Sequence, residues 1–61
     1  MFNADITINF EDGSTGAKVI SAASLEQVMD DAMHFVRRRV LEGRELKNNV
    51  VKHSVKGYEN A

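Results

Sequence analysis

A carboxylate and an imidazole at helical spacing form the pair in this chain best suited to acid–base chemistry. His34 follows Asp30 by four residues and Asp31 by three, and in a helix this spacing places an imidazole beside a carboxylate. Such a pair could act as a general base or supply half of a metal site. We interpret it instead as part of a solvated helix face, because His34 lies opposite the apolar residues of the same segment.

The second histidine, His53, lies in a segment with alternating polarity. Residues 50–56 place Val51, His53 and Val55 on one side of a strand, which indicates a hydrogen-bonded residue at the edge of the core. The chain has no cysteine, and two histidines on separate segments are few for a metal site. We therefore expect no metal, no other cofactor and no enzymatic activity.

Residues 13–16, Gly-Ser-Thr-Gly, have the composition of a glycine-rich phosphate loop. Such a loop opens into a helix and presents its amides to the phosphate, usually with a lysine nearby. Here it leads into the apolar, β-branched run of residues 17–20 and contains no lysine. The pattern predicts the turn of a β-hairpin.

Three consecutive arginines, Arg37, Arg38 and Arg39, allow two interpretations. They could grip nucleic-acid phosphates with the remaining bases of the second half, which are Arg44, Lys47, Lys52 and Lys56. Alternatively, they complement the C-terminal half of a helix dipole, with the stem of Arg39 along the core edge. We favour the second interpretation, since the net charge is −1 and no aromatic residues suited to base stacking are interleaved.

Charge is polarised along the sequence. Residues 1–31 contain six acidic residues and one lysine, whereas residues 32–61 contain seven basic and three acidic residues. The net charge of −1 argues against a general polyanion binder, whereas the polarised distribution is able to steer the encounter with a charged partner.

An amphipathic helix over residues 24–42 must position most of these groups. Its apolar stripe comprises Leu25, Val28, Met29, Ala32, Met33, Phe35, Val36 and Val40. Ser24 and Gln27 have the spacing of a reciprocal capping box. Gly43 could end the helix in the left-handed conformation, but Gly43 and Leu46 return to the stripe, so we favour a helix that continues to Lys47.

The elements before and after the helix are strands. Ile6, Ile8 and Phe10 alternate with polar residues, and the hairpin then leads to residues 17–20. With the strand at residues 50–56, the order is β-β-α-β. A right-handed crossover passing over the first strand predicts the sheet order 2-1-3, with one long helix on one face. We expect a single small α+β domain over residues 1–61.

Several exposed side chains are candidates for partner binding. Leu41, Tyr58 and Val50 are expected to be exposed apolar contacts, and a methionine beside arginines suits a protein-binding surface. The full set of partner-binding candidates is Met33, His34, Arg37, Arg38, Leu41, Arg44, Lys52, Lys56 and Tyr58. Lysines alone guard the two sheet edges, so we also expect that a homodimer could form through one edge.

The layout, with the segment Ser21-Ala22-Ala23-Ser24-Leu25-Glu26 introducing one helix, resembles small bacteriophage-encoded host-takeover proteins, such as compact inhibitors of bacterial RNA polymerase. This resemblance implies a protein that occupies a surface on a larger host protein. No membrane-spanning or secretory pattern is present, so we expect a soluble, cytoplasmic protein. The function expected is a phage- or mobile-element-encoded interaction module that modulates or inhibits a host bacterial protein; a nucleic-acid-binding regulator is the alternative.

Overall fold

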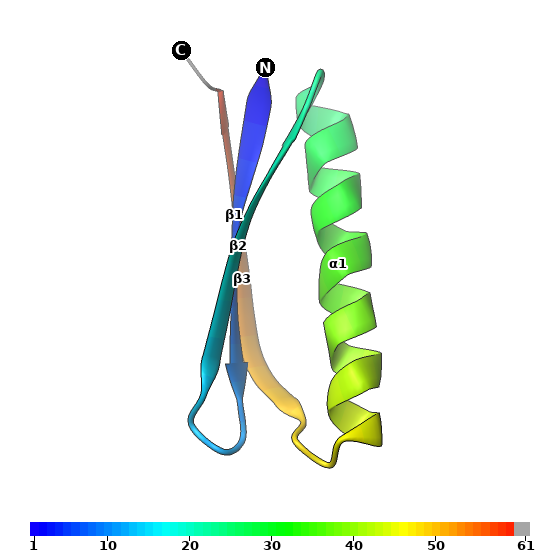
Figure 1. The fold of residues 1–61 in the computed structure, drawn as a ribbon. Coiled ribbons are helices and arrows are strands. Elements are labelled where there is room, and N and C mark those ends of the chain that lie inside the picture. The colour runs from blue at the N-terminus through cyan, green and yellow to red at the C-terminus, as the bar shows by residue number, and fades with distance from the viewer. Residues whose placement is uncertain (60–61) are drawn as a thin grey trace.

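The computed structural model describes residues 1–59 as a three-stranded sheet with one helix. The elements are β1 (Phe2–Phe10), β2 (Thr15–Ala22), α1 (Leu25–Glu45) and β3 (Val50–Glu59) (Figure 1). The strands lie in the order β2-β1-β3, and β1 is antiparallel to both neighbours. The α+β fold, the β-β-α-β order and the sheet order predicted from the sequence are confirmed.

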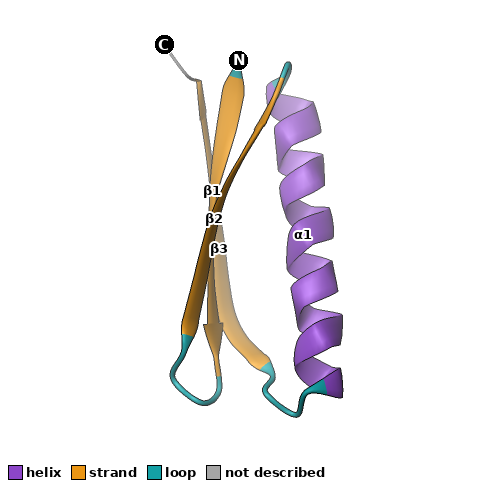
Figure 2. Cartoon of the chain, in the orientation of Figure 1, coloured by secondary structure: helices purple, strands orange, loops and turns teal. Residues whose placement is uncertain are grey.

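The molecule has two layers, because α1 covers one face of the sheet and leaves the other face open (Figure 1). The β1–β2 turn and the loop from α1 to β3 lie at the same end, and the link from β2 to α1 lies at the opposite end (Figure 2). No helix among the described residues combines the length and the apolarity needed to cross a membrane.

The core lies between β1 and α1. Alternate residues of β1 point toward the helix, and every fourth residue along α1 points back. The buried residues are Ala4, Ile6, Ile8, Val28, Ala32 and Val36. Burying an isoleucine or valine side chain contributes about 1.5–3 kcal/mol, so this small set supplies much of the driving force for folding.

A β-bulge changes which residues of β3 face the core. Asn9 pairs with Lys52 but Phe10 pairs with Val50, so Val51 has no residue opposite it on β1. Val50 therefore packs against the core, whereas the Val51 side chain is exposed at 63%. The predictions that Val51 faces inward beside His53 and that Val50 is exposed were both wrong, because strict alternation does not allow for the extra residue.

The strands are longer than their apolar patterns indicated. β1 begins at Phe2, where it pairs with Ala22 on one side and Glu59 on the other. The alternating pattern was clear only from Asp5, because polar Asn3 and small Ala4 conceal it. Backbone pairing, which is independent of side-chain type, extends the ladder beyond the region that hydrophobic periodicity detects.

The predicted hairpin turn is present between β1 and β2. Phe10 N–H donates to Ser14 O (2.9 Å) and Gly13 N–H donates to Phe10 O (3.0 Å). Gly13 adopts φ +90°, which glycine tolerates best. The Asp12 carboxylate accepts hydrogen bonds from Ser14 N (2.8 Å) and Ser14 Oγ (2.6 Å). Gly13 and the Asp-Ser pair therefore have a structural role in the turn.

Only half of the predicted capping box forms at the start of α1. Ser24 Oγ accepts a hydrogen bond from Gln27 N (3.1 Å), as expected for a helix N-cap. The Gln27 side chain does not return to Ser24; its Nε2 donates to Asp31 Oδ1 (2.8 Å) instead. A carboxylate one turn ahead offers a stronger acceptor along the helix surface.

The C-terminus of α1 is a Schellman motif. The helix passes through Gly43 and ends at Glu45, between the two endpoints that the sequence left open. Asn48 N–H donates to Gly43 O (2.8 Å), Lys47 N–H donates to Arg44 O (3.3 Å), and Lys47 takes the left-handed conformation (φ 56°). The residue that turns the chain is therefore a lysine.

Gly43 is buried because the loop after α1 folds back against it. A Cβ at this position would lie 2.7 Å from Asn48 O, a backbone atom with little freedom to move. Gly43 is therefore tightly packed, and its nearest neighbours belong to the loop after α1.

Three hydrogen bonds join the hairpin turn to the loop after α1. Glu11 N donates to Asn49 O (2.9 Å), while Asn49 N donates to Glu11 Oε1 (3.1 Å). Asp12 N donates to Asn48 Oδ1 (3.2 Å). These bonds hold the two loops together at one end of the molecule.

We expect Gly43→Ala to lower the free energy of unfolding by about 1 kcal/mol. Alanine favours a helix over glycine by about 1 kcal/mol, but overpacking against the Asn48 carbonyl costs roughly 1–3 kcal/mol. Urea unfolding followed by circular dichroism measures the difference. The control, Glu45→Ala, changes an exposed helical residue and is expected to stay within about 0.5 kcal/mol of the wild type. A gain in stability for Gly43→Ala would contradict the tight contact.

The Asp12 turn predicts a pH-dependent contribution to stability. Hydrogen bonds from the Ser14 hydroxyl and amide lower the pKa of Asp12 below its ordinary value of 3.8. A lowered folded-state pKa means that the stabilisation is present above the unfolded-state pKa and is lost as the pH falls through the folded-state pKa. The melting-temperature advantage of the wild type over Asp12→Asn should therefore shrink on acidification.

The matched control for this titration is Ser14→Ala, which removes the hydroxyl donor. An NMR titration of the Asp12 carboxyl should show a higher pKa in Ser14→Ala than in the wild type. Equal values in the two proteins would show that the hydroxyl bond does not favour the ionised form.

Candidate functional site

The His34–Asp30 pair is an open surface feature of α1. His34 Nε2 lies 3.6 Å from Asp30 Oδ2, and both side chains are mostly exposed. Asp31, the other carboxylate at helical spacing, accepts its bond from Gln27. Among residues 1–59, no group of three or more His, Cys, Asp or Glu side chains is arranged to hold a metal ion. The pair has the geometry of a solvated (i, i+4) contact.

An apolar groove between α1 and β3 gathers part of the predicted site. It is lined by Met33, Val36, Arg37, Val40, Leu41, Arg44 and His53. We call this set the α1–β3 groove. Val36 is buried and belongs to the core, whereas Leu41 is exposed at 57%. Arg37 and Arg44 are about two turns apart on the helix, and both line the groove together with its apolar residues.

His53 joins this groove because of its register in the sheet. It lies opposite Ile8 on β1 and therefore faces the same side of the sheet as the helix. The inward orientation predicted for His53 is confirmed, but its side chain is exposed at the rim. Sequence reasoning did not connect His53 with Met33 and Leu41, since only the β1–β3 register shows that the three share one hollow.

The structure divides the nine predicted partner-binding residues among three surfaces. The α1–β3 groove contains four of them: Met33, Arg37, Leu41 and Arg44. His34 and Arg38 lie on other parts of the helix surface. The remaining three, Lys52, Lys56 and Tyr58, face the open side of the sheet, because their β1 partners are Asn9, Asp5 and Asn3. One binding surface of nine residues is therefore not formed.

The open face of the sheet is largely polar and internally hydrogen-bonded. Tyr58 Oη donates to Asp5 Oδ1 (3.1 Å), and Ser21 Oγ donates to Asn3 Oδ1 (2.7 Å). Val19 is the large apolar side chain that β2 presents on this face, at 59% exposure. Tyr58 is thus exposed as predicted, but its hydroxyl is already engaged.

The flank of α1 next to β2 is built around the Phe35 ring. Lys18 Nζ lies 5.7 Å and Arg39 Cζ lies 5.1 Å from the ring centroid, which places two cations against one aromatic ring. Arg39 Nη1 also lies 2.8 Å from Glu42 Oε2. Arg39 therefore lies along the core edge, as the structural interpretation of the arginine run predicted.

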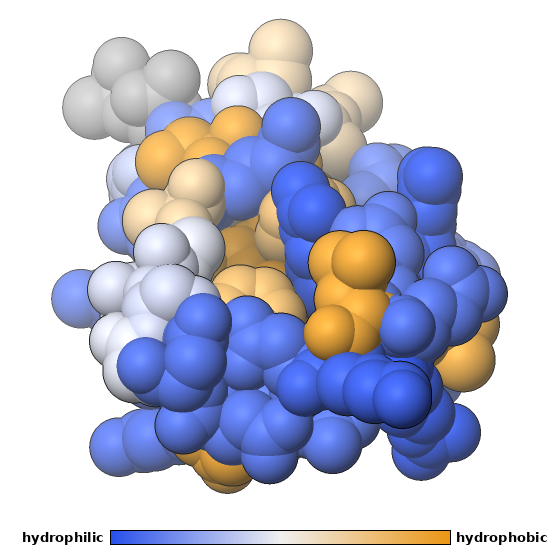
Figure 3. All heavy atoms as spheres, turned by 60° about the horizontal axis from the view of Figure 1, so that its bottom comes forward, coloured by the Kyte–Doolittle hydropathy of each residue, from blue (hydrophilic) through white to orange (hydrophobic). Residues whose placement is uncertain are grey.

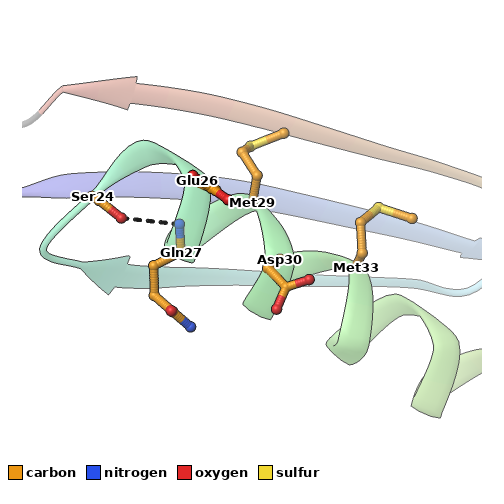
Figure 4. Close-up of a pocket in the computed structure, with 6 residues that line it drawn as sticks. All are labelled: Ser24, Glu26, Gln27, Met29, Asp30 and Met33. Carbon is orange, nitrogen blue, oxygen red and sulfur yellow. Dashed lines mark hydrogen bonds between the residues drawn. The ribbon is translucent and has the colours of Figure 1, made fainter.

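A further hollow lies at the start of α1, lined by Ser24, Glu26, Gln27, Met29, Asp30 and Met33 (Figure 4). The two methionine side chains point toward β3, whereas Gln27 and Asp30 point away from it. Near Met29, a Cβ added at Gly57 would lie 2.8 Å from the sulfur, so this glycine leaves room for the methionine. The hollow is mixed in polarity and broadly open.

The loop end of the molecule presents a mainly hydrophilic surface. In Figure 3, where this end comes forward, hydrophobic atoms form separate patches among hydrophilic ones. Leu46 is the most exposed large apolar residue, at 78%, and it lies outside the α1–β3 groove.

Comparisons of the chain with protein-family models, curated proteins and solved structures found no match.

We expect the three consecutive arginines to differ in their effect on stability. Arg39→Ala removes a cation from the Phe35 ring and a half-exposed ion pair, and should lower the free energy of unfolding by about 1 kcal/mol. Within residues 1–59, no ion pair involves Arg37 or Arg38, so Arg37→Ala and Arg38→Ala should remain within about 0.5 kcal/mol of the wild type. Thermal unfolding of the three variants measures this order. A large loss for Arg37→Ala or Arg38→Ala would show a structural role for those residues.

Proposed function

We propose that this chain is a small non-enzymatic protein-interaction module, encoded by a phage or mobile element, that modulates or inhibits a host bacterial protein in the cytoplasm. The observation that carries the proposal is the α1–β3 groove, in which the exposed side chains of Leu41 and Met33 lie beside Arg37 and Arg44. Methionine and arginine are enriched in protein interfaces, and exposed apolar side chains gain affinity when a partner covers them.

The composition of the groove indicates the chemistry of the partner segment. Its floor would accept apolar side chains, and Arg37 and Arg44 would pair with carboxylates at the rim. Loss of water around Leu41 and Met33 supplies affinity, whereas the arginines supply orientation and a faster encounter. We therefore propose a partner segment that combines two or more apolar side chains with acidic residues.

Nucleic-acid binding is the alternative function, and the number of bases in the second half of the chain supports it. The placement of these basic residues in the fold gives nucleic-acid binding less support. Arg37 and Arg44 line the groove, Lys52 and Lys56 face the open side of the sheet, and Arg39 is engaged with Phe35 and Glu42. A phosphate backbone is bound best by bases that lie along one surface.

Self-association through a sheet edge is a second part of the proposal. Both β2 and β3 are outer strands with one paired side each. Exposed strand edges favour pairing with another strand. Pairing of two copies into one extended sheet would stabilise the folded state of each copy, because binding to the folded form shifts the folding equilibrium toward it.

We expect Leu41→Gln to weaken capture of the partner by about tenfold, equivalent to about 1.4 kcal/mol. Tagged wild-type and variant chains are incubated with bacterial lysate, with and without nuclease, at low and moderate salt. Captured proteins are then quantified by mass spectrometry. The matched control is Leu46→Gln, which changes a still more exposed leucine outside the groove and should capture as the wild type does.

The nuclease and salt arms separate the two proposed functions. One protein that survives nuclease and moderate salt, and is lost with Leu41→Gln, supports the interaction module. Capture that disappears with nuclease and falls steeply with salt supports nucleic-acid binding. Equal loss in Leu41→Gln and Leu46→Gln would reject the groove as the binding surface.

A further inference from the structure

The outer edge of β2 is an unpaired strand edge of eight residues. β2 pairs with β1 along one side, and the sheet order leaves its other side as the end of the sheet. Its backbone N–H and C=O groups on that side are available to a strand of another chain. Lys18 is the one charged residue in this strand, and its ammonium lies against the Phe35 ring.

We infer that a second copy of this chain occupies this edge, with β2 of the two copies antiparallel about a two-fold axis at Val19. This inference rests on the self-association in the proposed function, and it specifies which strand edge pairs and which residues lie opposite each other. It joins two three-stranded sheets into one six-stranded sheet, with both helices on the same face.

Symmetry restricts the possible registers to a few. In an antiparallel pair about a two-fold axis, residues directly opposite each other point to the same face of the sheet. The sequence numbers of two opposite residues therefore differ by an even number. One residue lies opposite its own copy, and the axis passes between these two. Since β2 spans Thr15–Ala22, an axis at Lys18 or Val19 pairs nearly the whole strand.

The side chains choose between these two registers. An axis at Lys18 would place two ammonium groups directly opposite each other, which destabilises an antiparallel pair. An axis at Val19 instead places Val19 opposite its own copy on the open face, where β-branched pairs stabilise a sheet. On the helix face the same register sets Lys18 opposite Ile20 of the second copy.

Charges on the two helices suit this antiparallel arrangement. Phe35 marks the level of Lys18 along the helix, because the Lys18 ammonium lies 5.7 Å from its ring centroid. Asp31 precedes Phe35 by about one turn and Arg38 follows it by about one turn. The two-fold axis reverses the second helix, so the acidic N-terminal half of each helix lies beside the arginine-containing half of the other, and opposite charges attract across the join.

The β3 edge is a poorer place for a second copy. β3 carries Lys52 and Lys56, and the α1 flank beside it carries Arg37 and Arg44. A two-fold join there would double these four bases at one seam, and like charges at close range repel. The bulge at Val51 also interrupts the regular ladder on this strand. Self-pairing through β2 leaves the α1–β3 groove free for its own partner.

Single-cysteine cross-linking tests the edge and the register, because the chain has no cysteine of its own. Val19→Cys should form a disulfide-linked dimer under mild oxidation. The matched control is Val51→Cys, which changes an equally exposed valine on the other edge strand (63% against 59%) and should remain mostly monomeric. Equal cross-linking of both variants would overturn the assignment to β2.

Sedimentation of the unmodified chain and of two lysine variants tests the same inference without a cross-link. We expect the wild type to be dimeric at high micromolar concentration and Val19→Lys to weaken the dimer by about tenfold or more. Val51→Lys should dissociate as the wild type does. A monomeric wild type would overturn the inference, and circular dichroism confirms that each variant retains its fold.

The capture experiment keeps this result separate from the groove proposal. Leu41→Gln should lose the partner and remain a dimer, whereas Val19→Lys should become monomeric and still capture the partner. A monomeric wild type that captures its partner through Leu41 would reject the β2 join alone. A dimer in which Leu41→Gln captures normally would reject the groove alone.

Discussion

Contact between the central strand β1 and one stripe of α1 is the interaction on which the rest of the structure depends. Ile6 and Ile8 on the strand pack with Val28, Ala32 and Val36 on the helix, and these side chains are almost fully buried. A small domain buries a limited fraction of its surface, so few residues are available for other purposes in the interior. Function must therefore lie on the exposed flanks of α1, on the open sheet face or at the sheet edges.

The two flanks of α1 differ in chemistry because the helix sits between unlike strands. Beside β2, Phe35 is covered by Lys18 and Arg39, and Arg39 is held by Glu42. Beside β3, the α1–β3 groove keeps an apolar floor and open arginines. The first flank is closed by contacts within the chain, whereas the second offers groups that a partner could desolvate. This difference supports the assignment of one side to self-association and the other to a partner.

The fold followed from the sequence because its signals were local and consistent. Alternation around Ile6 and Ile8, the Asp-Gly-Ser turn and the Ser24 cap each favour the same elements, and the crossover rule then selects the sheet order. The candidate site was predicted less well. Helical spacing identified Met33, Arg37 and Leu41. Their position beside His53 depends on the β1–β3 register, which no local pattern specifies.

Two misassignments have a common physical cause. The inward assignment of Val51 failed at a bulge, and the favoured continuation of the helix to Lys47 failed at a Schellman turn. In both places the backbone departs from strict periodicity to satisfy hydrogen bonds. Side-chain patterns report periodic structure well, but they contain little information on where a backbone makes a single local exception.

The sheet order β2-β1-β3 places the last strand of the chain beside the first. During synthesis the hairpin and α1 emerge while one side of β1 still has no strand beside it. Until β3 leaves the ribosome, Ile6 and Ile8 are covered by the helix alone, and the ladder that ends at Phe2 and Glu59 cannot close. Folding of this chain is consequently governed by contacts distant in sequence, and the sheet is completed only once β3 has been made.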